Sequence, residues 1–153
     1  MFNVEKATND CIQWIRDWRE ENGPGCNLIV GISGGVDSLV AAELCVEAVG
    51  ADKVLGVIMP NYKQDDIDVA YDICQHVLGI DYLTINVGSA YDDIIDQIDA
   101  AFNVTDQTLI NLAPRLRMTT LYGVSQSHNG RVVNTCNLSE DYIGSVSYTH
   151  LRA

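Results

Sequence analysis

Basic residues are scarce in this 153-residue sequence, which carries 9 Lys and Arg against 21 Asp and Glu and has a formal net charge of −12 at pH 7. So few dispersed cations do not form the positive surface that a nucleic-acid backbone requires, and the net negative field would repel it. We therefore expect no nucleic-acid partner. Most of the acidic side chains are interpreted as a solvated surface that keeps the protein soluble.

Long apolar runs are also missing. No uninterrupted hydrophobic stretch reaches the length that spans a bilayer, and the first residues do not combine a basic start with an apolar block. These absences predict a cytoplasmic protein that has no membrane partner. The cysteines are odd in number and too widely spaced for a metal knuckle or a redox pair, which favours reduced thiols that lie mostly in the core. They are Cys11, Cys26, Cys45, Cys74 and Cys136.

What the sequence does contain is a hydrophobic share of 47%, which is enough for one core, and no repeat or linker that would divide it. Its most informative stretch begins with the apolar residues 28–32, passes through Ser33, Gly34 and Gly35, and enters a second apolar segment at residues 36–49. This pattern predicts a buried strand, a tight turn and a helix that packs on the strand.

The Ser33-Gly34-Gly35 turn has the composition of an anion-binding loop. Without bulky side chains, its backbone N–H groups can approach a ligand closely, and the following helix N-terminus adds partial positive charge. We therefore predict a phosphate site. Asp37 falls in the first helical turn, where its carboxylate either stabilises the helix dipole or holds Mg²⁺ beside a phosphate chain. The loop has neither the lysine of a Walker motif nor the glycine spacing of a dinucleotide fingerprint, which excludes both of those phosphate loops.

Strand and helix patterns alternate along the rest of the chain. We expect further strands at 54–59, 82–87 and 131–135, and helices from Val4 to before Asn22, at 64–78, and from a Ser89 cap onward. The first helix is expected to place its tryptophans on the core. The alternation predicts an α/β fold with a parallel sheet and helices on both faces.

Pro114 interrupts the helical pattern that follows residue 105. A helix capped by Asn111 would place the proline in its first turn, where the missing N–H has no partner in any case. In that position Arg115 and Arg117 oppose the helix dipole, which favours an anion beside them over a pair of solvated surface cations.

Three motifs carry a resemblance to a known family. Residues 31–38 resemble the signature of the ATP pyrophosphatases, and residues 111–118 followed by residues 135–140 are similar to ammonia-dependent NAD synthetase. The resemblance implies an adenine-nucleotide alpha hydrolase-like, Rossmann-like fold, the substrates ATP, deamido-NAD and ammonia, Mg²⁺ held by Asp37 and Glu140, and a homodimer. It also implies that Arg115 contacts deamido-NAD and that ATP is bound by Gly31, Ile32, Ser33, Gly34, Gly35, Val36, Asp37, Ser38, Met59 and Thr135.

The implied chemistry is amidation in two steps. The carboxylate of deamido-NAD attacks the α-phosphate of ATP, and ammonia then displaces AMP from the acyl-adenylate. No side-chain nucleophile is required, because the attacking groups are the substrate carboxylate and then ammonia. The turn amides of Ser33, Gly34 and Gly35 stabilise the departing pyrophosphate.

The end of the chain departs from the family pattern. Residues 145–153 match nothing in the family and resemble translated adapter sequence, so we expect residues 1–144 to form a partial synthetase domain that precedes a foreign tail. Two other interpretations stay open. One is another ATP pyrophosphatase, such as a GMP synthetase or a tRNA-thiolating enzyme, and the other is a non-catalytic ATP-binding module.

Overall fold

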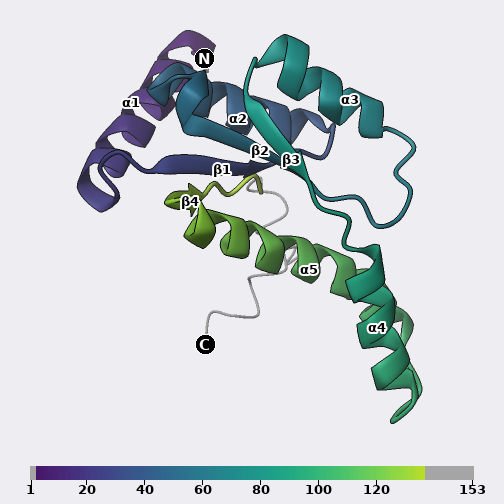
Figure 1. The fold of residues 1–153 in the computed structure, drawn as a ribbon. Helices are drawn as coiled ribbons and strands as arrows, with labels where there is room; N and C mark the ends of the chain where they lie inside the picture. The colour runs from purple at the N-terminus through teal and green to yellow at the C-terminus, as the bar shows by residue number, and fades with distance from the viewer. Residues whose placement is uncertain (1–2, 137–153) are drawn as a thin grey trace.

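A four-stranded parallel sheet lies at the centre of the protein. The computed structural model describes residues 3–136, and Figure 1 shows the sheet between two layers of helices. The sheet order is β3-β2-β1-β4, with Leu28 of β1 beside Val54 of β2. The expected parallel α/β fold is therefore confirmed. The strands are β1 (Asn27–Gly31), β2 (Val54–Ile58), β3 (Asp81–Thr84) and β4 (Gly130–Val132).

The two central strands, β1 and β2, form because their apolar side chains are buried on both sides of the sheet, whereas the edge strands β3 and β4 are more exposed. Leu28 and Val30 of β1 belong to one core cluster, whereas Ile29 between them belongs to the cluster on the other face. This two-residue alternation is the pleat of a strand that has helices on each side. β2 is buried along its whole length.

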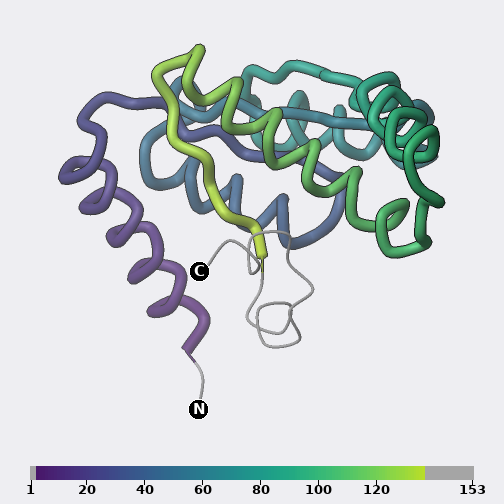
Figure 2. The backbone as a smooth tube through the Cα atoms, turned by 90° about the horizontal axis from the view of Figure 1, so that it is seen from below, coloured from purple at the N-terminus to yellow at the C-terminus, as the bar shows by residue number. Residues whose placement is uncertain are grey.

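The helices divide between the two faces (Figure 1). α1, α2 and α3 lie on one side of the sheet and α5 on the other, where α4 packs against it. Figure 2 shows α5 crossing the underside of the sheet, with α1 and α4 at opposite ends of the molecule. The helices are α1 (Val4–Asn22), α2 (Val36–Val49), the short turn η1 (Ala51–Lys53), α3 (Ile67–Asp72) with its π-helical continuation η2 (Ile73–Val77), α4 (Gly88–Asp99) and α5 (Asp106–Ser127).

Two expected helix starts are wrong. α5 begins at Asp106, where the Thr105 hydroxyl accepts a hydrogen bond from the Thr108 N–H, so Pro114 lies inside the helix rather than in its first turn. The earlier cap prevails because the threonine satisfies an N-terminal N–H and a whole additional turn forms. α4 begins at Gly88 after Val87, with no side-chain cap, so Ser89 does not cap it.

The tryptophan face of α1 also differs from the expectation. Trp14 is 64% exposed and stacks on Trp18, with ring centroids 6.4 Å apart, instead of entering the core. α1 is held to α2 by Arg16, which donates to the carbonyls of Glu47 and Ala48. The helix therefore needs few buried side chains to stay attached.

The cysteine prediction holds for three of the five thiols. Cys26, Cys45 and Cys74 are buried, whereas Cys11 and Cys136 are exposed. Burial raises the pKa of both Cys45 and Cys74 to about 11, so these thiols stay protonated at neutral pH. Among residues 3–136, no helix combines the length and the apolar character that crossing a membrane requires.

Candidate functional site

The turn after β1 is shaped by a glycine and by its fit to α3. Gly34 has φ +88°, a conformation that L side chains rarely adopt. A Cβ placed there would lie 3.6 Å from the Asp66 carbonyl oxygen and 3.7 Å from the Ala70 nitrogen. The turn thus rests against the backbone at the start of α3.

Two serine hydroxyls hold this turn from inside. Ser38 is only 4% exposed, and its hydroxyl donates to the Gly35 carbonyl at 2.9 Å while it accepts from the Ser33 N–H at 3.3 Å. The Ser33 hydroxyl lies 3.2 Å from the Ser38 oxygen and accepts from the Gly35 N–H. The hydroxyls of Ser33 and Ser38 therefore fix the path of the turn through hydrogen bonds within the turn itself.

The N-terminus of α2 has no side-chain cap. Gly35 is its N-cap residue and supplies no side-chain hydrogen bond to the first-turn N–H groups. These N–H groups and the helix dipole place partial positive charge behind the glycine turn. Asp37 lies in this first turn and is exposed, so its carboxylate suits a divalent cation that accompanies a phosphate chain.

The carboxyl end of β2 lies beside this turn. A Cβ at Gly31 would approach the Met59 Cε to 3.4 Å, so the predicted residues Gly31 and Met59 are neighbours at one edge of the sheet. Ile32, between Gly31 and the turn, is buried in the core. Val36, at the start of α2, is 69% exposed.

The two arginines of α5 have different surroundings. Arg117 is half-buried and its Nε donates to the Met59 carbonyl at 2.8 Å; burial lowers the pKa of this guanidinium. Arg115 is exposed. Because α5 begins at Asp106, both arginines lie in mid-helix, so the argument that they oppose the dipole at the helix start is wrong.

Two residues next to the site were missed from the sequence. The Gln64 side chain donates to the Ser33 carbonyl at 3.0 Å, which links the segment after β2 to the glycine turn. Asn86, just beyond β3, makes three hydrogen bonds to backbone atoms of Tyr62 and Gly88. Asn86 had a signal in the sequence, its place just after a strand, where side chains gather at the carboxyl edge of a parallel sheet, whereas Gln64 lies six residues beyond β2 and had none.

Thr135 and Glu140 follow β4. Because β4 pairs in parallel with β1 and the Val133 N–H donates to the Ile29 carbonyl, the chain leads Thr135 toward the edge that carries the glycine turn. Glu140 lies outside the described residues, so its pairing with Asp37 stays a prediction. The expected tail at 145–153 also lies outside them. Within residues 3–136, no three His, Cys, Asp or Glu side chains are grouped as a metal site.

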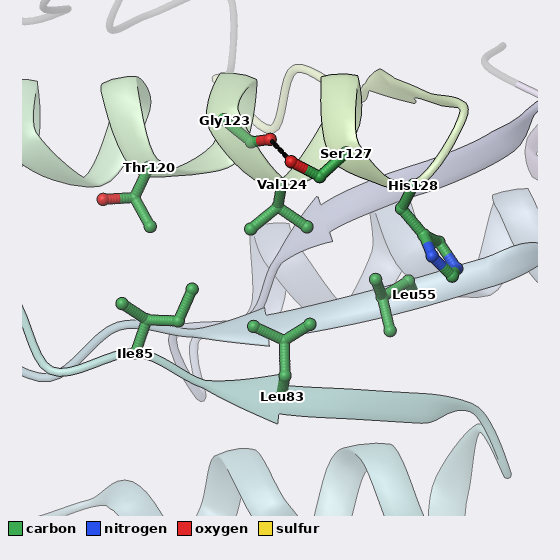
Figure 3. A pocket seen from close by; sticks show the side chains of 8 residues that line it. All are labelled: Leu55, Leu83, Ile85, Thr120, Gly123, Val124, Ser127 and His128. Atoms are coloured by element: carbon green, nitrogen blue, oxygen red, sulfur yellow. Dashed lines mark hydrogen bonds between the residues drawn. The ribbon is translucent and has the colours of Figure 1, made fainter.

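A separate apolar pocket of about 550 Å³ lies on the other side of the sheet, away from the glycine turn. Figure 3 shows Leu55, Leu83 and Ile85 pointing from the sheet toward the helix that carries Thr120 and Val124. The lining contains no acidic or basic side chain apart from His128. Its chemistry does not suit a triphosphate.

The sequence matches proteins of one family along almost its whole length. The family model for NAD synthase matches residues 7–149. The chain is 40% identical over 143 residues to the NH(3)-dependent NAD(+) synthetase of Thermococcus kodakarensis, covering 94% of this chain and 55% of that protein. It is 38% identical over 146 residues to the protein of the same name from Carboxydothermus hydrogenoformans, covering 93% and 58%. The chain thus spans about half the length of the curated relatives it matches.

Solved structures give the same result for the fold. The NH3-dependent NAD synthetase from Campylobacter jejuni superposes with a TM-score of 0.83 at 30% identity, over 94% of this chain and 61% of the other. An NMN synthetase from Francisella tularensis gives a TM-score of 0.83 at 29% identity, over 96% and 60%. A parallel sheet whose first strand ends in a glycine-serine turn, matched in sequence and in shape, places this chain in the NAD synthase family.

Proposed function

We propose that the protein takes part in the ATP-dependent amidation of deamido-NAD to NAD with ammonia. The observation that carries this proposal is the N-terminus of α2, which presents first-turn N–H groups without a side-chain cap behind Gly34 and places Asp37 beside them. The family match supports the reaction class. Because the chain spans about half of its relatives, the reaction and its substrates are proposed for the whole protein.

In this proposal the glycine turn holds the β- and γ-phosphates of ATP. The turn Ser33-Gly34-Gly35 and the start of α2, including Val36 and Ser38, surround the pyrophosphate that leaves. Without ligand the Ser33 and Gly35 N–H groups donate to the Ser38 and Ser33 hydroxyls, so the Gly34 N–H and the first-turn N–H groups of α2 are the donors that need no rearrangement. Gly31, Ile32 and Met59 form the neighbouring strand ends, where the adenosine part binds, and Thr135 approaches ATP from β4. The turn is held rigid by its serine hydrogen bonds, which reduces the reorganisation needed when charge develops on the leaving group.

Mg²⁺ is proposed to bind Asp37 and Glu140, and its charge offsets the negative charge of the phosphates. The exposed carboxylate of Asp37 in the first turn of α2 fits this group, since oxygen ligands beside phosphates are the setting that Mg²⁺ prefers. Arg115 is proposed to contact deamido-NAD.

The reaction needs an activated acyl group because a carboxylate is a poor electrophile. The carboxylate oxygen of deamido-NAD bonds to the α-phosphorus of ATP, and the bond from that phosphorus to the pyrophosphate oxygen breaks. Ammonia then bonds to the acyl carbon, loses a proton, and AMP leaves with the oxygen that linked it. The chain's contribution is to bind and orient the phosphates, so no side chain becomes covalently modified.

The test is calorimetry with ATP and Mg²⁺, combined with an assay for AMP release. We expect binding of MgATP that Asp37→Asn weakens roughly tenfold, because one carboxylate ligand of the cation is lost. Lys6→Met, which removes a charge from a 71% exposed side chain that pairs with Asp10 in α1, is the control. Absence of MgATP binding would contradict the proposal.

The acceptor is tested in the same assay. Deamido-NAD, nicotinate mononucleotide and xanthosine monophosphate are compared with ammonium present, the second because one solved relative is named an NMN synthetase. AMP release with deamido-NAD supports the proposal. Release only with xanthosine monophosphate would favour a GMP synthetase-like enzyme, and binding without release would favour an ATP-binding module.

We also propose that the protein forms a homodimer in the cytoplasm. The support lies on α4, α5 and the turn between them, where Phe102 is 75% and Ile110 69% exposed. Large apolar side chains that gather on one side of a protein are typical of an interface between subunits.

A further inference from the structure

The Asn86 side chain makes two hydrogen bonds to the Tyr62 backbone, of the kind that a neighbouring strand would make. Its Oδ1 accepts from the Tyr62 N–H at 3.1 Å, and its Nδ2 donates to the Tyr62 carbonyl at 2.9 Å. The same Oδ1 accepts from the Gly88 N–H at 2.9 Å, at the start of α4. The side chain therefore adds to backbone hydrogen bonds that join the same two segments, in which the Ile85 N–H donates to the Ile58 carbonyl and the Val87 N–H donates to the Pro60 carbonyl.

The residue that Asn86 holds is in an unfavourable conformation. Tyr62 has φ +59°, in the left-handed region that non-glycine residues avoid. Such a conformation persists only where the surroundings impose it. The Tyr62 hydroxyl also donates to the Asp92 carboxylate, and its ring lies over Gly88, where a Cβ would come within 2.7 Å of the ring.

The segment held in this way reaches the glycine turn. Two residues after Tyr62, the Gln64 side chain donates to the Ser33 carbonyl at 3.0 Å. The backbone that follows, at Asp66 and Ala70, is what Gly34 rests against. The contacts thus form a continuous path from Asn86 through Tyr62 and Gln64 to Ser33.

We propose that Asn86 is a positioning residue for MgATP, which it serves by clamping Tyr62 so that Gln64 keeps the glycine turn in its binding conformation. This inference rests on the proposed function of the glycine turn. Without the Asn86 side chain, Tyr62 loses both backbone partners and leaves its strained conformation, so the Gln64 contact to Ser33 is no longer held. Asn86 itself need not touch the nucleotide.

The test is a double-mutant cycle on MgATP affinity, measured by calorimetry on the whole chain. Asn86→Ala and Gln64→Ala should each weaken MgATP binding roughly tenfold. The double variant should have about the same MgATP affinity as the single variant that binds less tightly, because both substitutions act through one contact. Asn27→Ala is the matched control, because the Asn27 Nδ2 also donates to a distant carbonyl, that of His128, but at the opposite edge of the sheet. Asn27→Ala should leave the MgATP affinity unchanged. Additive losses would overturn the proposal.

Hydrogen exchange on the ligand-free protein tests the clamp without nucleotide. Asn86→Ala should speed exchange in residues 61–66 and also in residues 33–36, whereas Asn27→Ala should speed neither. Faster exchange confined to residues 61–66 would overturn the proposal. If the unmodified protein binds no MgATP, the proposed function fails, and the exchange pattern still decides whether the clamp controls the turn.

Discussion

At the scale of single residues, the site depends on positions where the backbone conformation or a buried hydrogen bond requires one particular residue type. Gly34 supplies a positive φ, and Ser38 supplies a buried hydroxyl that serves both as donor and as acceptor. The glycine turn itself was predictable, because residues without bulk between a strand and a helix indicate a tight turn, whereas the internal hydrogen bonds of Ser38 were not predicted. The contribution of Gln64 was not predictable, since its partner Ser33 lies 31 residues away in the sequence.

A glycine substitution separates backbone strain from ligand binding. Gly34→Ala should lower the free energy of unfolding by about 1 kcal/mol, because alanine at φ +88° is strained although the space for its Cβ is adequate. The same change should weaken MgATP binding, because relief of the strain moves the turn amides. Urea unfolding and calorimetry measure the two effects.

Gly25→Ala is the matched control for this prediction. Gly25 has φ +73° and no atom within 4 Å of the added Cβ, so its stability cost should be similar. It lies before β1, away from the turn, and MgATP affinity should not change. Equal losses of affinity in both variants would show that Gly34 acts only through global stability.

At the scale of the elements, apolar periodicity predicted the strands and the starts of α1 and α2 well, whereas the starts of α4 and α5 were missed. The expected helix at 36–49 matches α2, because a buried strand, a glycine turn and an apolar helix each leave a strong pattern. The start of α5 was missed because Pro114 was given more weight than the Thr105 cap. Proline inside a helix lowers helix stability, and the packing of the 22-residue α5 on β1 and β4 outweighs that loss.

This explanation predicts that Pro114 destabilises α5. Pro114→Ala restores an N–H that can donate to the Ile110 carbonyl and removes the ring from the preceding turn, so the free energy of unfolding should rise by about 2 kcal/mol. Urea unfolding measures the change. The control is Pro24→Ala in the turn where the Cys26 N–H donates to the Gly23 carbonyl. Proline suits that position, and its loss should lower stability by about 0.5 kcal/mol. A loss of stability in Pro114→Ala would contradict the explanation.

At the scale of the whole molecule, the two faces of the sheet are covered unequally. α1, α2 and α3 cover one face, whereas α5 leaves room beside β2 and β3 for the apolar pocket between Leu83 and Val124 (Figure 3). The exposed apolar side chains of α5 and of the turn before it lie on this same side of the sheet. Other exposed apolar side chains, such as Trp14 of α1 and Val40 of α2, lie on the opposite face, so the pocket is what distinguishes the side that carries α5.

The proposed homodimer therefore has a specific test. Phe102→Asp and Ile110→Asp should each shift the protein toward monomer in analytical ultracentrifugation, because a charge would be buried at the interface. Val77→Asp is the control, since Val77 is 54% exposed but lies at the end of η2 on the other face. A dimer that resists both changes, or a monomeric unmodified protein, would contradict the prediction.

The sequence by itself determined the parallel α/β fold, the glycine turn and its family, because these depend on local periodicity and on an eight-residue motif. The tertiary structure alone decided that Arg117 reaches Met59, that Trp14 stays on the surface, and that Gln64 donates to Ser33 while Asn86 bonds the Tyr62 backbone. These facts depend on which strand ends meet at one edge of the sheet. Contacts between residues distant in sequence are set by sheet order and by helix starts, and neither is fixed by the local pattern of the chain.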